Sequence, residues 1–180
     1  MMRFFRMDHP VAMKKTAPVI TFTGRSGSGK TTLIEKLVTR FAAGGMRVGV
    51  VKHMRHEFDI DLPGKDTHRY RSSGAAVSSI TNGQSMAIIA DGIGGLSPLD
   101  AAPSLFAACD LVIIEGQKEG AYPKIEVIGP STESPLYLAG VENIIALASD
   151  AHHPVGMPVF KRDDIDAIAR FVLNAAGINP

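Results

Sequence analysis

The chain has 180 residues, with 19 Lys and Arg, 18 Asp and Glu, and a formal net charge of +1 at pH 7. A balance this close to neutral offers no basic surface for nucleic acid or for an anionic membrane, so neither is expected as a partner. The single cysteine, Cys109, excludes an internal disulfide and suits a reducing compartment, which favours a cytoplasmic location. No apolar run approaches the ~20 residues of a transmembrane helix.

The length suits one domain, which we expect over residues 17–180. Residues 1–16 mix charged and apolar side chains without an apolar centre. They do not have the pattern of a secretory signal, and we expect a disordered leader there. Cys109 lies beside an apolar run and is expected to be a small buried hydrophobic residue rather than a nucleophile.

A glycine-rich turn follows the first apolar, β-branched run, residues 19–23, and precedes a helical pattern. Its spacing is Gly24-x4-Gly29-Lys30-Thr31. Glycines so placed let backbone N–H groups surround an anion, and the helix that follows directs its positive dipole end at that anion. The motif predicts a phosphate-binding loop in which Lys30 reaches the β- and γ-phosphates and Thr31 binds Mg²⁺. The expected nucleotide contacts are Gly24, Arg25, Ser26, Gly27, Ser28, Gly29, Lys30, Thr31 and Thr32. The alternative is a plain Gly/Ser turn between a strand and a helix.

Strand and helix patterns alternate along the rest of the chain. Residues 46–52 follow the first helix as a strand, and such a βαβ unit requires a parallel neighbour. The continuous apolar runs 111–114 and 144–147 are typical of strands covered on both faces. Helices are expected at 98–108 and 163–175. The pattern predicts a doubly wound, mostly parallel α/β sheet of the P-loop NTPase type, with ligands at the carboxyl ends of its strands.

One segment departs from this parallel scheme. Residues 76–81 and 85–90 flank Asn82-Gly83, which is a strong hairpin signal. We expect an inserted antiparallel hairpin, whose edge can pair with another chain.

The strand at 111–114 lies between two acids. Asp110 precedes it and Glu115 ends it, so the two lie about 16 Å apart at ~3.3 Å per residue. Because ligands gather at the carboxyl end, Glu115 is predicted to act on Mg²⁺ or its water, and Lys30, Thr31 and Glu115 are the predicted catalytic residues. Alternatively Glu115 is a solvated acid, since sites of this class more often use Asp.

A long polar loop between Lys52 and Gly74 carries further candidates. Asp59 and Asp61 are predicted to reach the Mg²⁺ through water, with the loop ordering around the γ-phosphate. By residue type these acids and two histidines, His53 and His56, also suit a transition metal, although the spacing specifies no geometry. A basic cluster follows, which either binds an acidic second substrate or is the solvated face of a short helix: Lys65, His68, Arg69 and Arg71.

Asp150 emerges at the carboxyl end of the strand that begins at Ile144, on the same edge as the phosphate loop. A carboxylate there can accept hydrogen bonds from N1–H and the N2 amino group of guanine, so Asp150 is predicted to read the base. The alternative is that Asp150 caps the following turn.

Arg25 occupies a loop position where one subclass of dimeric P-loop proteins carries a lysine that reaches the phosphates of the partner subunit. An equivalent role in trans is a hypothesis for Arg25, and the ordinary alternative is an exposed arginine in a turn.

Several stretches together resemble the MobB family, the molybdopterin-guanine dinucleotide biosynthesis protein B. They are Lys52-His53, residues 58–66, Arg69, Gly74-Ala75, Ile114-Glu115-Gly116 and Lys124-Ile125. The resemblance extends over residues 18–171 and implies a weakly hydrolytic GTP-binding protein, usually a homodimer, that assists the enzyme attaching GMP to molybdopterin. In place of the Asn-Lys-x-Asp tetrad of many GTPases this chain has Ala148-Ser149-Asp150.

Three functions fit these observations. The first is a GTP- and Mg²⁺-dependent accessory protein of molybdenum cofactor maturation with slow hydrolysis, since no obvious water-orienting Gln lies near the loop. The second is a small-molecule kinase that binds its acceptor at the basic cluster. The third is an adaptor that binds the nucleotide without turnover.

Overall fold

The chain divides into two compact units in the computed structural model, which describes residues 17–54 and 56–179. Unit 1 comprises the described residues of Met1–His53 and Ala102–Pro180. Unit 2 comprises those of Met54–Ala101. The leader predicted over residues 1–16 lies outside the described residues, and the single domain over 17–180 stays a prediction. In the described part of the chain, no helix is both long enough and apolar enough to cross a membrane.

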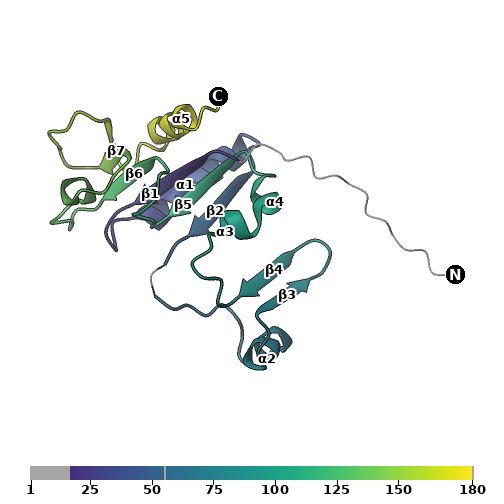
Figure 1. Ribbon diagram of the computed structural model, residues 1–180. Helices are drawn as coiled ribbons and strands as arrows, with labels where there is room; N and C mark the ends of the chain where they lie inside the picture. Colours follow the sequence, from purple (N-terminus) through teal and green to yellow (C-terminus); the bar gives the residue numbers. More distant parts are fainter. Residues whose placement is uncertain (1–16, 55, 180) are drawn as a thin grey trace. The chain divides into compact units, whose positions relative to one another are not determined.

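Unit 1 is built on a six-stranded sheet with the order β2-β5-β1-β6-β7-β8 (Figure 1). Every pairing between neighbouring strands is parallel, as the continuous apolar runs predicted. The strands are β1 (Val19–Thr23), β2 (Val48–Lys52), β5 (Leu111–Glu115), β6 (Lys124–Ile128), β7 (Ile144–Ser149) and β8 (Val159–Phe160).

One face of this sheet packs against the two long helices, α1 (Lys30–Ala43) and α5 (Ile165–Ala175). The apolar stripe of each helix joins alternate strand residues in one buried core, because successive strand side chains point to opposite faces. The core includes Leu33, Leu37 and Phe41 of α1, Ile168 and Val172 of α5, and Ile20, Phe22, Ile113, Ile125 and Val127 of the sheet. Asp164 caps α5 by accepting a hydrogen bond from the Ala167 N–H.

Short helices cover the opposite face of the sheet: α4 (Pro103–Phe106) and the 3₁₀ helix η1 (Leu136–Ala139). A Cβ atom added at Gly49 would stand 3.1 Å from the Phe106 ring and 3.2 Å from the sulfur of Cys109, so α4 packs directly on β2. The helix predicted over 98–108 is in fact two short helices, because Pro103 disfavours helical backbone at Ala102. Cys109 is partly buried.

Unit 2 contains α2 (Asp66–Ser72), the antiparallel pair β3 (Val77–Thr81) and β4 (Met86–Ala90), and α3 (Pro98–Ala101). The turn forms as predicted, with Gly83 at φ +85° and the Asn82 side chain accepting hydrogen bonds from the Gln84 and Ser85 N–H groups. The parallel sheet with its helices and the inserted hairpin confirm the predicted fold class.

A buried carboxylate fixes η1 on the sheet. Glu126 of β6 is fully buried, and its two oxygens accept hydrogen bonds from the N–H groups of Leu136 at 2.5 Å and Tyr137 at 2.9 Å. These are first-turn N–H groups, which have no partner inside the helix. The segment held in this way carries Ser134, whose carbonyl accepts a hydrogen bond from Arg25 at the tip of the glycine-rich loop.

Glu126→Gln is expected to lower the free energy of unfolding by about 1–3 kcal/mol, because the amide nitrogen cannot accept and one buried N–H loses its partner. Urea unfolding followed by circular dichroism measures the change. Glu133→Gln is the matched control, since Glu133 is exposed. Equal stability of the two variants would contradict the anchoring role of Glu126.

Candidate functional site

The glycine-rich loop leaves the carboxyl end of β1 and enters α1 at Lys30. Gly24 has φ +144°, and a Cβ atom there would stand 2.4 Å from the Val127 carbonyl oxygen, so the loop lies directly against β6. Gly29 is the N-cap of this helix, which has no side-chain cap and no acid in its first turn. The N–H groups of that turn have no partner within the helix, and the dipole favours an anion at this end. Local geometry thus fits a phosphate group.

The Lys30 ammonium lies over the loop. It donates to the carbonyl oxygens of Gly24 at 3.1 Å and Arg25 at 2.7 Å, and it lies 3.5 Å from the Ser28 hydroxyl. Partial burial lowers the pKa of Lys30, and the nearby Glu115 carboxylate opposes this shift. A strong anion in the loop would satisfy this partly desolvated cation.

Glu115 and Thr31 meet at the carboxyl edge of the sheet. The Thr31 hydroxyl donates to Oε1 of Glu115 at 2.8 Å, and the Lys52 ammonium lies 3.9 Å from the same oxygen. Glu115 is 8% exposed, so it is not a freely solvated acid. Asp110, at the opposite end of β5, accepts a hydrogen bond from the Arg47 N–H and has a structural role. A hydroxyl beside a carboxylate is an oxygen donor set that suits Mg²⁺.

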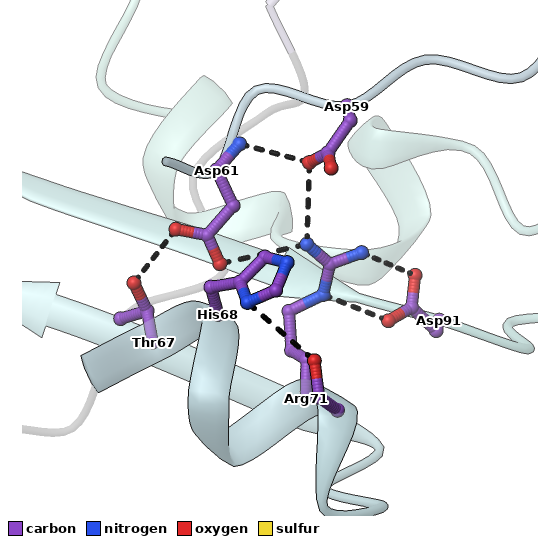
Figure 2. Close-up of polar contacts among 7 residues, drawn as sticks. Asp59, Asp61, Thr67, His68, Arg71 and Asp91 are labelled. Atoms are coloured by element: carbon purple, nitrogen blue, oxygen red, sulfur yellow. Dashed lines mark hydrogen bonds and ion pairs between the residues drawn. The ribbon is translucent and has the colours of Figure 1, made fainter. Parts of the chain in front are cut away.

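Asp59 and Asp61 belong to unit 2, where both bind Arg71 (Figure 2). Oδ1 of Asp59 and Oδ2 of Asp61 each lie 3.5 Å from Nη1 of Arg71. Asp91 accepts hydrogen bonds from Nε and Nη2 of the same guanidinium. The Asp61 N–H lowers the pKa of Asp59, and Arg71 adds to the shift. The water-mediated Mg²⁺ contact of these acids stays a prediction, and it requires them to share their oxygens with Arg71.

The remaining candidates of the long loop are its two histidines and the predicted basic cluster. His53 lies in unit 1 and His56 in unit 2. Over residues 17–54 and 56–179, no three His, Cys, Asp or Glu side chains are arranged to hold a metal ion. Within the predicted basic cluster, the three carboxylates around Arg71 offset its charge, and Arg69 lies 3.8 Å from Asp66. Lys65 is exposed at the start of α2.

Asp150 follows β7 at the predicted edge and lines a pocket of about 530 Å³. Its oxygens are occupied by Arg162: Oδ1 accepts from the backbone N–H at 3.1 Å, and Oδ2 accepts from Nε at 2.8 Å and from Nη2. Hydrogen bonds from Arg162 lower the pKa of Asp150. The pocket is lined by Gly29, Thr32, Leu33, Lys36, Asp150, Lys161, Arg162 and Asp163. Direct reading of a base by Asp150 stays a prediction.

Arg162 is the residue of this region that the sequence did not single out. Its Nη1 lies 3.4 Å from the Ser28 carbonyl oxygen and 3.5 Å from the position of a Cβ on Gly29. A usable signal existed, because Lys161-Arg162-Asp163 directly follows a short strand, at the carboxyl edge where ligands gather.

Comparison with known proteins identifies the family. The family model described as "MobB: Molybdopterin guanine dinucleotide synthesis protein B" matches residues 19–150. The chain belongs to the MobB family. It is 32% identical over 168 residues to the molybdopterin-guanine dinucleotide biosynthesis adapter protein of Escherichia coli, covering 91% of this chain and 95% of that one. The Haemophilus influenzae protein of the same name is 32% identical over 166 residues, covering 91% and 92%.

Solved MobB structures agree with the fold. The crystal structure of Bacillus subtilis MobB matches with a TM-score of 0.69 and 28% identity, over 88% of this chain and 97% of that one. A MobB homologue from Bacillus stearothermophilus matches with a TM-score of 0.65 and 28% identity over the same shares. The MobB family match contains the phosphate loop, Glu115 and Asp150, and it ends before Arg162.

Proposed function

We propose that this chain is a GTP-binding accessory protein of molybdopterin guanine dinucleotide biosynthesis, with weak Mg²⁺-dependent GTPase activity. The observation that carries the proposal is the 2.8 Å hydrogen bond between Thr31 and Glu115 beside the Lys30 ammonium. A hydroxyl and a carboxylate close to a lysine, at the carboxyl edge of a parallel sheet, support the proposed binding of Mg²⁺ and phosphate. Bound GTP would supply the phosphates, and Mg²⁺ would neutralise charge between them.

The expected partner is the enzyme that attaches GMP to molybdopterin. Relatives from Escherichia coli and Haemophilus influenzae are named adapter proteins of this biosynthesis, and this chain covers more than nine-tenths of each. An adapter needs no fast chemistry, which suits slow hydrolysis. A cytoplasmic location is part of the proposal and rests on the single cysteine and the near-neutral charge.

The kinase alternative is less well supported. It requires a basic cluster that is available to an acidic acceptor, whereas Arg71 is bound by Asp59, Asp61 and Asp91. An adaptor without turnover has the same binding site as the proposed protein and differs from it only in phosphate release.

A homodimer formed through unit 2 is also proposed. Ser78 is the only buried residue among those described in unit 2, so no hydrophobic side chain is buried there. Hairpin residues that are apolar and exposed include Val77, Ile80, Met86 and Ile88. An isolated two-stranded hairpin is marginally stable, and its edge is a template for pairing with another chain. A second copy of this hairpin is the proposed partner.

Lys30→Ala is expected to weaken GTP binding by about a hundredfold or more, because each charge-assisted hydrogen bond to phosphate contributes about 1.5–3 kcal/mol. Titration calorimetry with GTP and Mg²⁺ measures the affinity, and circular dichroism verifies the fold. Lys65→Ala is the control, since Lys65 is exposed on unit 2. Unchanged affinity in Lys30→Ala would exclude a phosphate site in this loop.

Glu115→Gln is expected to weaken GTP binding in Mg²⁺ by roughly tenfold and to leave binding in EDTA nearly unchanged. The amide still accepts from the Thr31 hydroxyl but loses the charge that favours the metal. Asp110→Asn is the control at the opposite end of the same strand. Equal losses with and without Mg²⁺ would show that the Glu115 carboxylate serves another purpose.

Ile88→Lys is expected to shift the chain from dimer to monomer, because a charge at a buried apolar interface is costly. Light scattering measures the mass in solution. Leu138→Lys places the same change on an exposed residue of unit 1 and is expected to leave the dimer intact. A monomeric wild-type chain, or a dimer in both variants, would contradict this interface.

A further inference from the structure

Arg162 joins three parts of unit 1 that are distant in sequence. It follows β8 at the carboxyl edge of the sheet, binds Asp150 after β7 with its side chain and its backbone N–H, and reaches the Ser28 carbonyl oxygen in the phosphate loop. Its side chain is 29% exposed and lines the 530 Å³ pocket. No role follows for this residue from phosphate or Mg²⁺ binding alone.

The contacts with Asp150 and Ser28 engage only the edges of the Arg162 guanidinium. All five N–H donors of an arginine lie in the plane of the group, and Asp150 and Ser28 occupy its edges. The free surface is therefore a flat face, which stacks well on aromatic rings. Asp150 keeps this plane in one orientation through contacts at Nε and Nη2.

The pocket that Arg162 lines adjoins the phosphate loop. Gly29 and Thr32 line it from the first turn of α1, and Leu33 and Lys36 line it further along the helix. A group attached to phosphates in the loop would extend into this space. Its volume lies within the range of small-molecule sites, about 300–1,000 Å³. Among the described residues that line it none is aromatic, so Arg162 is the planar side chain offered to a ring.

We propose that this pocket receives the nucleoside part of the nucleotide and that the base stacks on Arg162, with Asp150 acting as a positioning residue that holds the guanidinium. The inference rests on the proposed binding of GTP. It differs from direct reading of guanine by Asp150, because the oxygens of Asp150 are already occupied by Arg162.

The test uses two probes, GTP and inorganic tripolyphosphate, which has no nucleoside. Arg162→Ala is expected to weaken GTP binding by about tenfold, the effect of losing one stacked base, and to change tripolyphosphate binding by less than about twofold. Arg162→Lys keeps the charge without the plane and is expected to lose nearly as much GTP affinity. Arg170→Ala, on the exposed side of α5, is the matched control and is expected to bind both probes as the wild type does.

Asp150→Asn separates the two possible roles of this carboxylate. If it positions Arg162, the variant loses affinity for GTP and XTP by the same factor. A shift in preference from GTP to XTP would show that Asp150 reads the base, and would overturn the inference.

Two other results would also overturn it: GTP affinity of Arg162→Ala equal to that of Arg170→Ala, or equal losses for GTP and tripolyphosphate. Should Arg162→Ala fail to fold by circular dichroism, Arg162→Lys and Asp150→Asn carry the same test. Wild-type protein that binds neither probe would overturn the proposed function and this inference together. Wild-type binding of both probes without an effect of Arg162 would overturn only the inference.

Discussion

The parallel register of three central strands is the constraint on which the site depends. β1 pairs with β5 so that Phe22 is level with Glu115, and it pairs with β6 so that Thr23 is level with Glu126. Parallel strands end at a common edge, where the glycine-rich loop leaves β1 and Glu115 ends β5. The hydrogen bond between Thr31 and Glu115, which lies 84 positions later in the chain, is a consequence of this register. A slip of one residue would turn Glu115 to the other face of the sheet.

The face of the sheet that lies away from α1 is held by buried charged groups as well as by apolar packing. Glu126 accepts the first N–H groups of η1. Lys124 is 1% exposed, and its ammonium donates to the Gly120 and Tyr122 carbonyl oxygens at 2.6 Å and 3.2 Å. Burial lowers the pKa of Lys124. Buried charges require such partners, so these two side chains fix η1 and the segment that contains Gly120 and Tyr122 on the sheet.

Unit 2 exposes several large apolar side chains beside a group of ion pairs. Asp59 and Asp61 bind Arg71, while Phe58, Ile60 and Leu62, which alternate with them, are 66%, 70% and 65% exposed. One guanidinium is shared by carboxylates from separate segments of this unit (Figure 2). The exposed apolar side chains of this unit are the basis of the dimer proposed above.

Features that depend only on short stretches of the chain could be predicted from the sequence. The phosphate-loop spacing, the Asn82-Gly83 turn and the continuous apolar strands depend on local backbone preference and burial, so the parallel sheet and its hairpin were predictable. The position of Glu115 at the ligand edge followed from counting residues along one strand. The association of Asp59 and Asp61 with Arg71, and of Asp150 with Arg162, was decided only by the tertiary structure. A carboxylate has no sequence signal for its partner, since charge pairing acts through space and any of several cations along the chain would satisfy it.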